Sequence, residues 1–426
     1  MNALPKVSLI IVSHNRPAEL ARVLSSLRYL DYPTFEVIVV SNHDPRALFP
    51  AIFGIEHIKF VPFERANISA ARNLGINAAA GEIIAFCDDD AVPEPTWLSH
   101  LVAGFADPAI AAAGGYVRGR NGISFQWQGN RFDRFGNQFP LKPVPNETLA
   151  ISGNAEFGVK TEGTNCAYRA DTLRALGGFD ESFCYYLDET DLNYRLGLAG
   201  WKTALVPKAE VHHRFAANDT RNRQRAPKDL FQIGASKAYF CKKHANSSDL
   251  KAELDRFQTA QRIRLIKFML AGSIEPRDLR RIMPTLLAGY QDGLSRQPIL
   301  NKLSSRGNKA FQAFPAGMTG GACLGFACRW WQWPKYRKGI KVLSARGYSV
   351  TVFRLSLSTM FHRMRFCPEG YWLQSGGIFG RAERKSTIFR KSSLIVRAES
   401  ELTRLKEVRP IKKLSSWNEL EALVKS

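Results

Sequence analysis

Residues 83–92 read Ile-Ile-Ala-Phe-Cys-Asp-Asp-Asp-Ala-Val, an apolar run that ends on three acids, Asp88, Asp89 and Asp90. Pro93 prevents the run from continuing, so we expect a short buried strand that ends at the acids. Ligands bind at the carboxyl ends of strands in open α/β sheets. Three carboxylates there repel one another unless a cation lies among them, which favours Mg²⁺ or Mn²⁺. The alternative is a solvated acidic turn that caps the next helix.

Strands alternate with helices before this point. Continuous apolar runs predict strands over residues 7–12 and 35–40, and helical spacing predicts helices over residues 18–30 and 67–79. This alternation is typical of parallel βαβ units with right-handed crossovers. Because no GxGxxG follows the first strand, a dinucleotide-binding Rossmann domain is disfavoured.

A second acidic group opens a later helix. Asp188-Glu189-Thr190-Asp191 precedes an expected helix over residues 192–198, which closes at Gly200. For Asp188 and Asp191, capping of this helix is as good an interpretation as a role in catalysis. Glu189, at the second position of the acidic stretch, could take a proton from a hydroxyl nucleophile if it lies at a cleft. Further on, His212 and His213 end another expected strand, where a neutral imidazole is a good metal ligand.

The segment from about residue 119 to 163 mixes aromatic residues with Gly, Asn and Arg. It suits either a loop-rich insertion over a site or a small peripheral core.

The charge divides the 426-residue chain into two halves. Residues 1–217 hold 20 Lys and Arg against 23 Asp and Glu, so residues 218–426 carry +25 and account for the whole net charge of +22. A solvated surface is the simplest explanation. An excess confined to one half favours an anionic partner, either an acidic membrane face or nucleic acid.

The sequence predicts a cytoplasmic protein. No run of eighteen apolar residues is present, and the first residues lead into a strand without a secretion leader. Seven cysteines without paired CxxC spacing favour reduced thiols. Peripheral attachment to the inner face of the cell membrane remains open.

In the basic half we expect helices over residues 228–243, 249–270 and 276–294. Residues 322–337 contain Trp330 and Trp331 beside arginine and lysine, which suits either a bilayer interface or a helix that packs its tryptophans into a domain core. Short strands are expected over 341–343 and 348–353, a glycine-rich loop over 366–380 and a helix over 417–425. We therefore divide the chain into a catalytic domain (1–217), a helical basic extension (218–338) and a small C-terminal α/β region (339–426).

Five motifs together resemble the family 2 glycosyltransferases of the GT-A fold: VSLIIVSHNRP (7–17), NISAARNLGINAAAGEIIAFCDDDAVPEPTWL (67–98), GTNCAYR (163–169), LDETDLNYRL (187–196) and VPKAEVHH (206–213). The resemblance covers about residues 5–215. It implies an α/β fold with a Rossmann-like mixed sheet, followed here by a mainly helical basic region.

The resemblance also implies roles for single residues. Asp90 and His213 would hold the metal, with His212 as the alternative because the register is uncertain by one, and Glu189 would be the general base, flanked by Asp188 and Asp191. The remaining implied residues are donor-binding Ser13, Asn15, Arg16, Ser41, Asn42, Arg72, Asn73, Asp88 and Asp89, and acceptor-side Gly163 and Asn165.

One departure from the family pattern concerns the nucleobase. The family usually has Val-Asp-x-x-Ser-x-Asp after the second strand, whereas this chain has Val40-Ser41-Asn42-His43-Asp44. Because the acid that contacts the base is missing, the sequence leaves the base of the donor open.

The resemblance implies a metal-dependent, inverting hexosyltransferase that moves a sugar from a nucleoside diphosphate to a hydroxyl acceptor. A surface polysaccharide or glycolipid is the expected product, and no nucleic acid is expected as a partner. Two alternatives stay open: a nucleotidyltransferase, and a basic membrane- or nucleic-acid-binding protein with a degenerate transferase domain.

Overall fold

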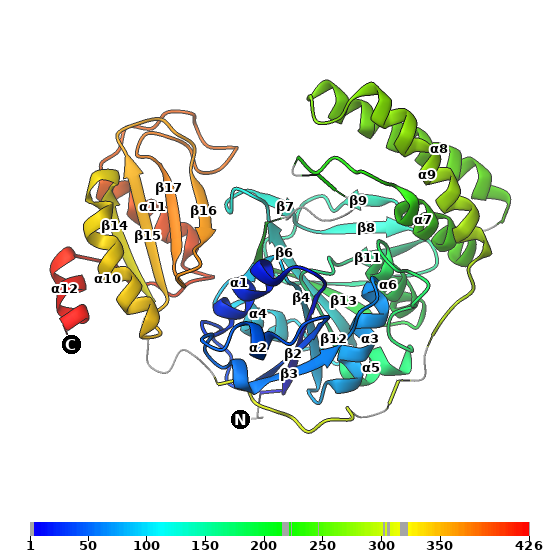
Figure 1. Cartoon of the computed structure of the whole chain (residues 1–426), viewed down its shortest axis with the longest axis horizontal. Helices are drawn as coiled ribbons and strands as arrows, with labels where there is room; N and C mark the ends of the chain where they lie inside the picture. The colour runs from blue at the N-terminus through cyan, green and yellow to red at the C-terminus, as the bar shows by residue number, and fades with distance from the viewer. Residues whose placement is uncertain are drawn as a thin grey trace.

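The computed structural model describes residues 4–214, 221–222, 224–245, 247–300, 303–304, 307–315 and 323–425. These residues form a ten-stranded, a five-stranded and a three-stranded sheet, with helices packed around them (Figure 1). Residues of the N-terminal half form the ten-stranded sheet, and residues near the end of the chain form the five-stranded sheet. The two sheets lie side by side (Figure 1). This arrangement confirms the expected α/β class.

Four parallel strands form one side of the large sheet: β1 (Val7–Ser13), β2 (Phe35–Ser41), β3 (Ile58–Pro62) and β4 (Ile83–Asp88). Their connections are α1 (Pro17–Leu27), α2 (Pro45–Leu48), the 3₁₀ turn η1 (Ile55–His57) and α3 (Ile68–Ala78). Helices cover both faces, so β1, β2 and β4 are apolar along almost their whole length. The register brings the ends of three strands, Ser13, Ser41 and Asp88, to one edge.

The other side of the sheet is mixed, as expected. β12 (Cys166–Arg169) runs antiparallel between β4 and β6 (Ile110–Arg118). β13 (Lys202–His213) runs parallel to β6 and pairs antiparallel with β10 (Leu149–Ser152) and β5 (Ala91–Pro93). The helices of this part are α4 (Trp97–Ala103), α5 (Ala170–Ala175) and α6 (Asp188–Leu198). Pairing of His213 with Ala91 brings the end of β13 beside the acids that follow β4.

The aromatic insertion contains regular structure. β7 (Phe125–Trp127) pairs with β6, and β8 (Asn130–Asp133), β9 (Gln138–Pro140) and β11 (Phe157–Lys160) form the three-stranded sheet. Phe132 is buried with Phe183, Leu187 and Phe240. The burial of Phe132 therefore favours a small peripheral core over a loop-rich insertion as the interpretation of this segment.

Three long helices follow the large sheet: α7 (Phe231–His244), α8 (Ser247–Leu270) and α9 (Pro276–Ser295). They confirm three of the helices expected in the basic half. α7 and α9 approach closely at glycines, because a Cβ atom on Gly289 would lie 2.2 Å from the Phe231 carbonyl oxygen. Among the helices in the described ranges, none is long and apolar enough to cross a bilayer.

The five-stranded sheet corrects three local expectations. Its order is β16-β17-β15-β14-β18, with β14 (Leu324–Arg329), β15 (Val350–Ser356), β16 (Arg363–Phe366), β17 (Trp372–Gly377) and β18 (Leu414–Ser415). A helix packed into a domain core was one of two interpretations of residues 322–337, but the described part of this segment contains β14 before the helical residues begin. Residues 341–343 were expected as a strand and lie in a helix, and the expected loop at 366–380 contains β17.

The helices of this unit are the 3₁₀ turn η2 (Trp330–Gln332), α10 (Trp333–Ala345), α11 (Leu394–Leu405) and α12 (Trp417–Lys425). α10 forms where a strand was expected because Tyr336, Ile340 and Leu343 repeat at helical spacing and are buried together. Since its first strand starts at Leu324, we propose that the C-terminal unit begins there rather than at residue 339.

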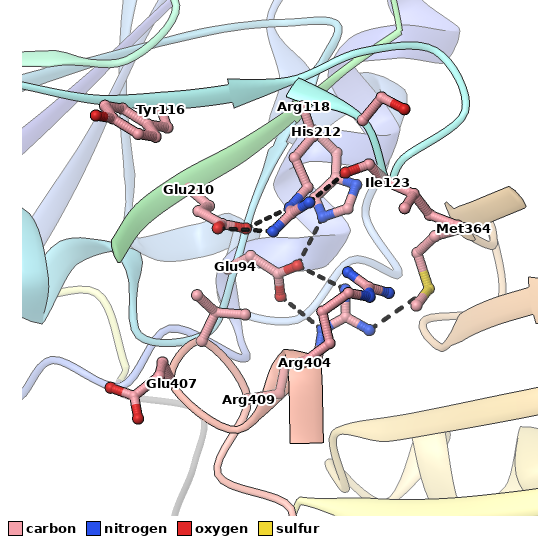
Figure 2. A network of polar contacts seen from close by, with 12 residues as sticks. Glu94, Tyr116, Arg118, Ile123, Glu210, His212, Met364, Arg404, Glu407 and Arg409 are labelled. Atoms are coloured by element: carbon pink, nitrogen blue, oxygen red, sulfur yellow. Dashed lines mark hydrogen bonds and ion pairs between the residues drawn. The ribbon is translucent and has the colours of Figure 1, made fainter. Parts of the chain in front are cut away.

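A buried ion-pair network joins the two sheets (Figure 2). The Arg409 guanidinium donates to both oxygens of Glu94 at 2.6 and 2.7 Å, and all atoms of both side chains are buried. His212 lies 2.6 Å from Glu94 and contacts the Trp372 ring. Burial alone would raise the pKa of Glu94, but Arg409 and His212 hold it at about 2. The two sheets therefore share one desolvated charge pair.

Arg409→Ala should destabilise the protein by about 3–5 kcal/mol, because it leaves Glu94 buried without its cation. Urea unfolding measures the loss. Lys413→Ala is the matched control, since it removes an exposed pair with Glu419 and should cost less than about 1 kcal/mol. Equal effects of the two substitutions would contradict the structural role of Arg409.

Candidate active site

The acids after β4 meet the end of β13. One ligand atom from each of Asp88, Asp90 and His213 lies within 4.8 Å of the others, and the Asp90 Oδ1 to His213 Nε2 distance is 3.0 Å. His212 points the opposite way, toward Glu94, because neighbouring residues of a strand face opposite sides. Of the two histidines, the geometry thus places His213 beside the acids.

Two carboxylates and one imidazole are ligand types that Mg²⁺ or Mn²⁺ accepts in a partly open site. Burial opposes the charge on Asp90, but His213 and Arg16 outweigh it and hold the pKa of Asp90 well below its ordinary value. Asp89 behaves differently, because burial raises its pKa to about 7 even with Arg16 beside it. The donor set therefore fits a divalent cation at Asp88, Asp90 and His213.

The loop after β1 contacts the acids directly. Arg16 donates to Asp89 and to Asp90, each at 2.7 Å, and the Ser13 hydroxyl donates to Asp89 at 2.8 Å. Positive charge from the first βα turn therefore lies at the same strand edge as the acids.

The loops after β1 and β2 are tied together. The Asn42 side-chain amide donates to Asn15 at 2.6 Å, and the Asn15 backbone donates to Asn42 at 3.1 Å. The Ser41 hydroxyl donates to the His43 carbonyl. These three residues lie at the expected edge of the sheet.

Arg72, on α3, joins the two acidic groups. It forms an ion pair with Asp188, lies 3.6 Å from Asp88, and donates to the Gly163 carbonyl oxygen at 3.2 Å. A Cβ atom on Gly163 would lie 2.5 Å from the guanidinium, so the glycine leaves room for Arg72. Asp88 and Asp188, one from each acidic group, thus both lie beside Arg72.

Glu189 has a lysine partner that sequence reasoning missed. It forms an ion pair with Lys160 at the end of β11, and its side chain is 11% exposed. Lys160 is buried, which lowers its pKa, and it also lies 3.9 Å from Glu162. Nothing in the sequence marks Lys160, because the pair depends on how the insertion folds over α6.

Other expected site residues have their polar atoms bound within the fold. Asp191 is fully buried and pairs with Arg195 at 2.9 Å and with Lys243 and His244 at 2.7 Å, which ties α6 to α7. Asn73 donates to the Phe179 carbonyl at 2.8 Å.

Asn165 is also occupied within the fold. It accepts a hydrogen bond from Trp97 and donates to the carbonyl oxygens of Tyr116 and Ala209. Asp191, Asn73 and Asn165 therefore hold elements in place.

Comparison with curated proteins finds relatives that match about half of this chain. An O-antigen biosynthesis protein from Myxococcus xanthus is 28% identical over 236 residues, which are 50% of this chain and 18% of that protein. A pre-mycofactocin glycosyltransferase from Mycobacterium tuberculosis is 27% identical over 215 residues, 49% of this chain and 42% of that protein. The chain thus spans less than half the length of these two relatives.

Among solved structures, a mannosyltransferase from Pyrobaculum calidifontis in complex with GDP-Man and Mn²⁺ superposes with a TM-score of 0.42 and 16% identity. The superposition covers 69% of this chain and 88% of that one. Residues 8–173 match the family model described as Glycosyl transferase family 2. Over these residues, the resemblance to family 2 glycosyltransferases that the motifs carry is confirmed.

Proposed function

We propose that the protein is a metal-dependent, inverting glycosyltransferase that moves a sugar from a nucleoside diphosphate to a hydroxyl acceptor. The observation that carries the proposal is the meeting of two acidic groups at Arg72, which forms an ion pair with Asp188 and lies 3.6 Å from Asp88, while Asp88, Asp90 and His213 lie together at a metal-ligand spacing. A bound Mg²⁺ or Mn²⁺ would neutralise the charge that develops on the diphosphate leaving group.

The chain's own residues supply the remaining steps. Arg16 and Arg72 add positive charge where the diphosphate would lie, which stabilises a departing anion. Glu189 takes the proton from the acceptor hydroxyl, and the ion pair with Lys160 holds that carboxylate in place until the acceptor hydroxyl takes the position of the lysine. Attack from the side opposite the leaving group inverts the anomeric configuration.

The same contacts refine the proposed roles. Ser13, Asn15, Arg16, Ser41, Asn42, Arg72, Asp88 and Asp89 are proposed to contact the donor, and Gly163 the acceptor side. We assign Asn73, Asn165 and Asp191 to positioning, because their polar atoms are used within the fold.

The match of residues 8–173 to family 2, and the relative in O-antigen biosynthesis, support a surface polysaccharide or glycolipid as product. A nucleotidyltransferase is less well supported, because the turn at Ser13–Pro17 has no glycine-rich loop with a lysine. A degenerate binding domain would not need Asp88, Asp90 and His213 kept together at a metal-ligand spacing. We place the enzyme in the cytoplasm.

A nucleoside diphosphate should raise the melting temperature only when Mn²⁺ is present, since a ligand that binds the folded state stabilises it by about 2.7 kcal/mol at about a hundred times its dissociation constant. The measurement is a thermal-shift panel of nucleoside diphosphates with and without Mn²⁺. Asp90→Asn and His213→Ala should lose the metal-dependent part, whereas Asp44→Asn, on the partly exposed Asp44–Arg46 pair, should keep it. If no nucleoside diphosphate shifts the melt under either condition, the enzymatic proposal fails.

Glu189→Gln should lower transfer by about 10²–10⁴-fold, because the amide cannot accept the acceptor's proton. The assay follows release of the nucleoside diphosphate from whichever donor the thermal-shift panel identifies, and donor binding should survive. Glu162→Gln is the matched control, since Glu162 is the second carboxylate near Lys160 and has no role in the proposed chemistry. Full turnover in purified Glu189→Gln would remove Glu189 as the base.

A further inference from the structure

The five-stranded sheet gathers exposed apolar side chains at one edge. β14, β15 and β17 run parallel, so the chain leaves all three at the same edge. Nine residues there are between 51% and 64% exposed: Trp330 and Trp331 after β14, Leu357, Met360 and Phe361 after β15, Ile388 and Phe389 after β17, and Ile395 and Val396 in the first turn of α11. We call these nine residues the apolar edge.

Hydrogen bonds hold the loops of the apolar edge together. The Gly377 backbone donates to the Met360 carbonyl at 2.9 Å, and the Arg390 backbone donates to the Phe379 carbonyl at 3.0 Å. The rings of Phe379 and Phe389 lie 5.6 Å apart. The segments after β15 and β17 therefore form one continuous surface, rather than separate exposed residues.

Cations surround this surface. Between residues 378 and 396 the chain carries one acid, Glu383, and five basic residues: Arg381, Arg384, Lys385, Arg390 and Lys391. The Arg381 guanidinium lies 4.6 Å from the centre of the exposed Phe361 ring. Aromatic and aliphatic side chains among lysine and arginine suit the headgroup region of an acidic bilayer.

A polar groove of about 270 Å³ lies between the 382–390 segment and α11. Arg390, Arg397 and Arg404 line it, together with Glu383 and Glu401. Nε of Arg397 and Nη1 of Arg404 have no hydrogen-bond partner among the described residues. Arginine donors beside an apolar surface suit a phosphate that is attached to a lipid chain.

The apolar edge faces the same way as the candidate active site. At the middle of the five-stranded sheet, the Met364 backbone of β16 donates to Asn121, in the loop after β6 at the carboxyl edge of the large sheet. Near the amino edges, Tyr29 donates to Ser344, in the last turn of α10. The parallel strands of the two sheets therefore point in one direction, and Figure 1 shows the sheets side by side.

We propose that the apolar edge docks on an anionic phospholipid bilayer and thereby turns the carboxyl edge of the catalytic sheet toward the membrane. This deepens the proposed function, on which it rests for one point: the acceptor hydroxyl would belong to a lipid-linked molecule at that surface. Docking itself requires no transfer.

Co-sedimentation of the full chain with vesicles tests the proposal. Binding is expected to equimolar phosphatidylcholine and phosphatidylglycerol, but not to phosphatidylcholine alone. The triple substitution Phe361→Ser, Ile388→Ser and Phe389→Ser should weaken binding roughly tenfold or more by removing buried apolar area. Replacing Arg384, Lys385 and Arg390 by serine should weaken it by about fivefold for each cation removed.

The matched control is Ile263→Ser with Leu270→Ser, two exposed apolar residues on α8. This control should bind vesicles like the unmodified chain, and all variants should melt at the same temperature. The proposal would be overturned if only the α8 control lost vesicle binding or if the unmodified chain did not bind vesicles. It would also be overturned if the unmodified chain bound single-stranded RNA through the same cations. If vesicles fail to bind while a nucleoside diphosphate still shifts the melt, docking is wrong and the proposed function stands.

Discussion

The repulsion among the acids after β4 is the constraint on which the candidate site depends. Asp88, Asp89 and Asp90 follow a strand that is almost wholly buried, and desolvation opposes their charge. The fold answers with Arg16 from the first βα turn, Arg72 from α3 and the imidazole of His213. These cations and ligands converge because parallel strands end at one edge of the sheet. The order and direction of the strands therefore bring the compensating positive charges to the acids.

Local signals in the sequence predicted the strands at the apolar runs 7–12 and 35–40 and the strand that starts at Ile83. The mixed sheet and the approach of the two acidic groups, which the family resemblance implied, are also present. The secondary structure of the tryptophan-rich segment 322–337 was harder to predict, because a short apolar run such as β14 has the same composition as a turn of buried helix. Only tertiary pairing with β15 identifies it as a strand.

The partners that tertiary packing supplies could not be predicted. Lys160 reaches Glu189 across 29 residues, and Arg409 reaches Glu94 across 315. Neither pair leaves a periodic or spaced pattern in the chain. The choice between His212 and His213 likewise required the register of β13 against β5, because a shift of one residue exchanges the two faces of a strand. The network through Glu94 thus makes the C-terminal sheet a neighbour of the candidate metal ligands.

The most direct test of the central claim is anomalous diffraction at the manganese edge, from crystals grown with Mn²⁺ and the nucleoside diphosphate that binds. The account predicts one strong peak within bonding distance of Asp88, Asp90 and His213, with the diphosphate between that peak and Arg72. A manganese peak elsewhere, or a bound nucleotide that leaves these three side chains without an ion, would contradict it.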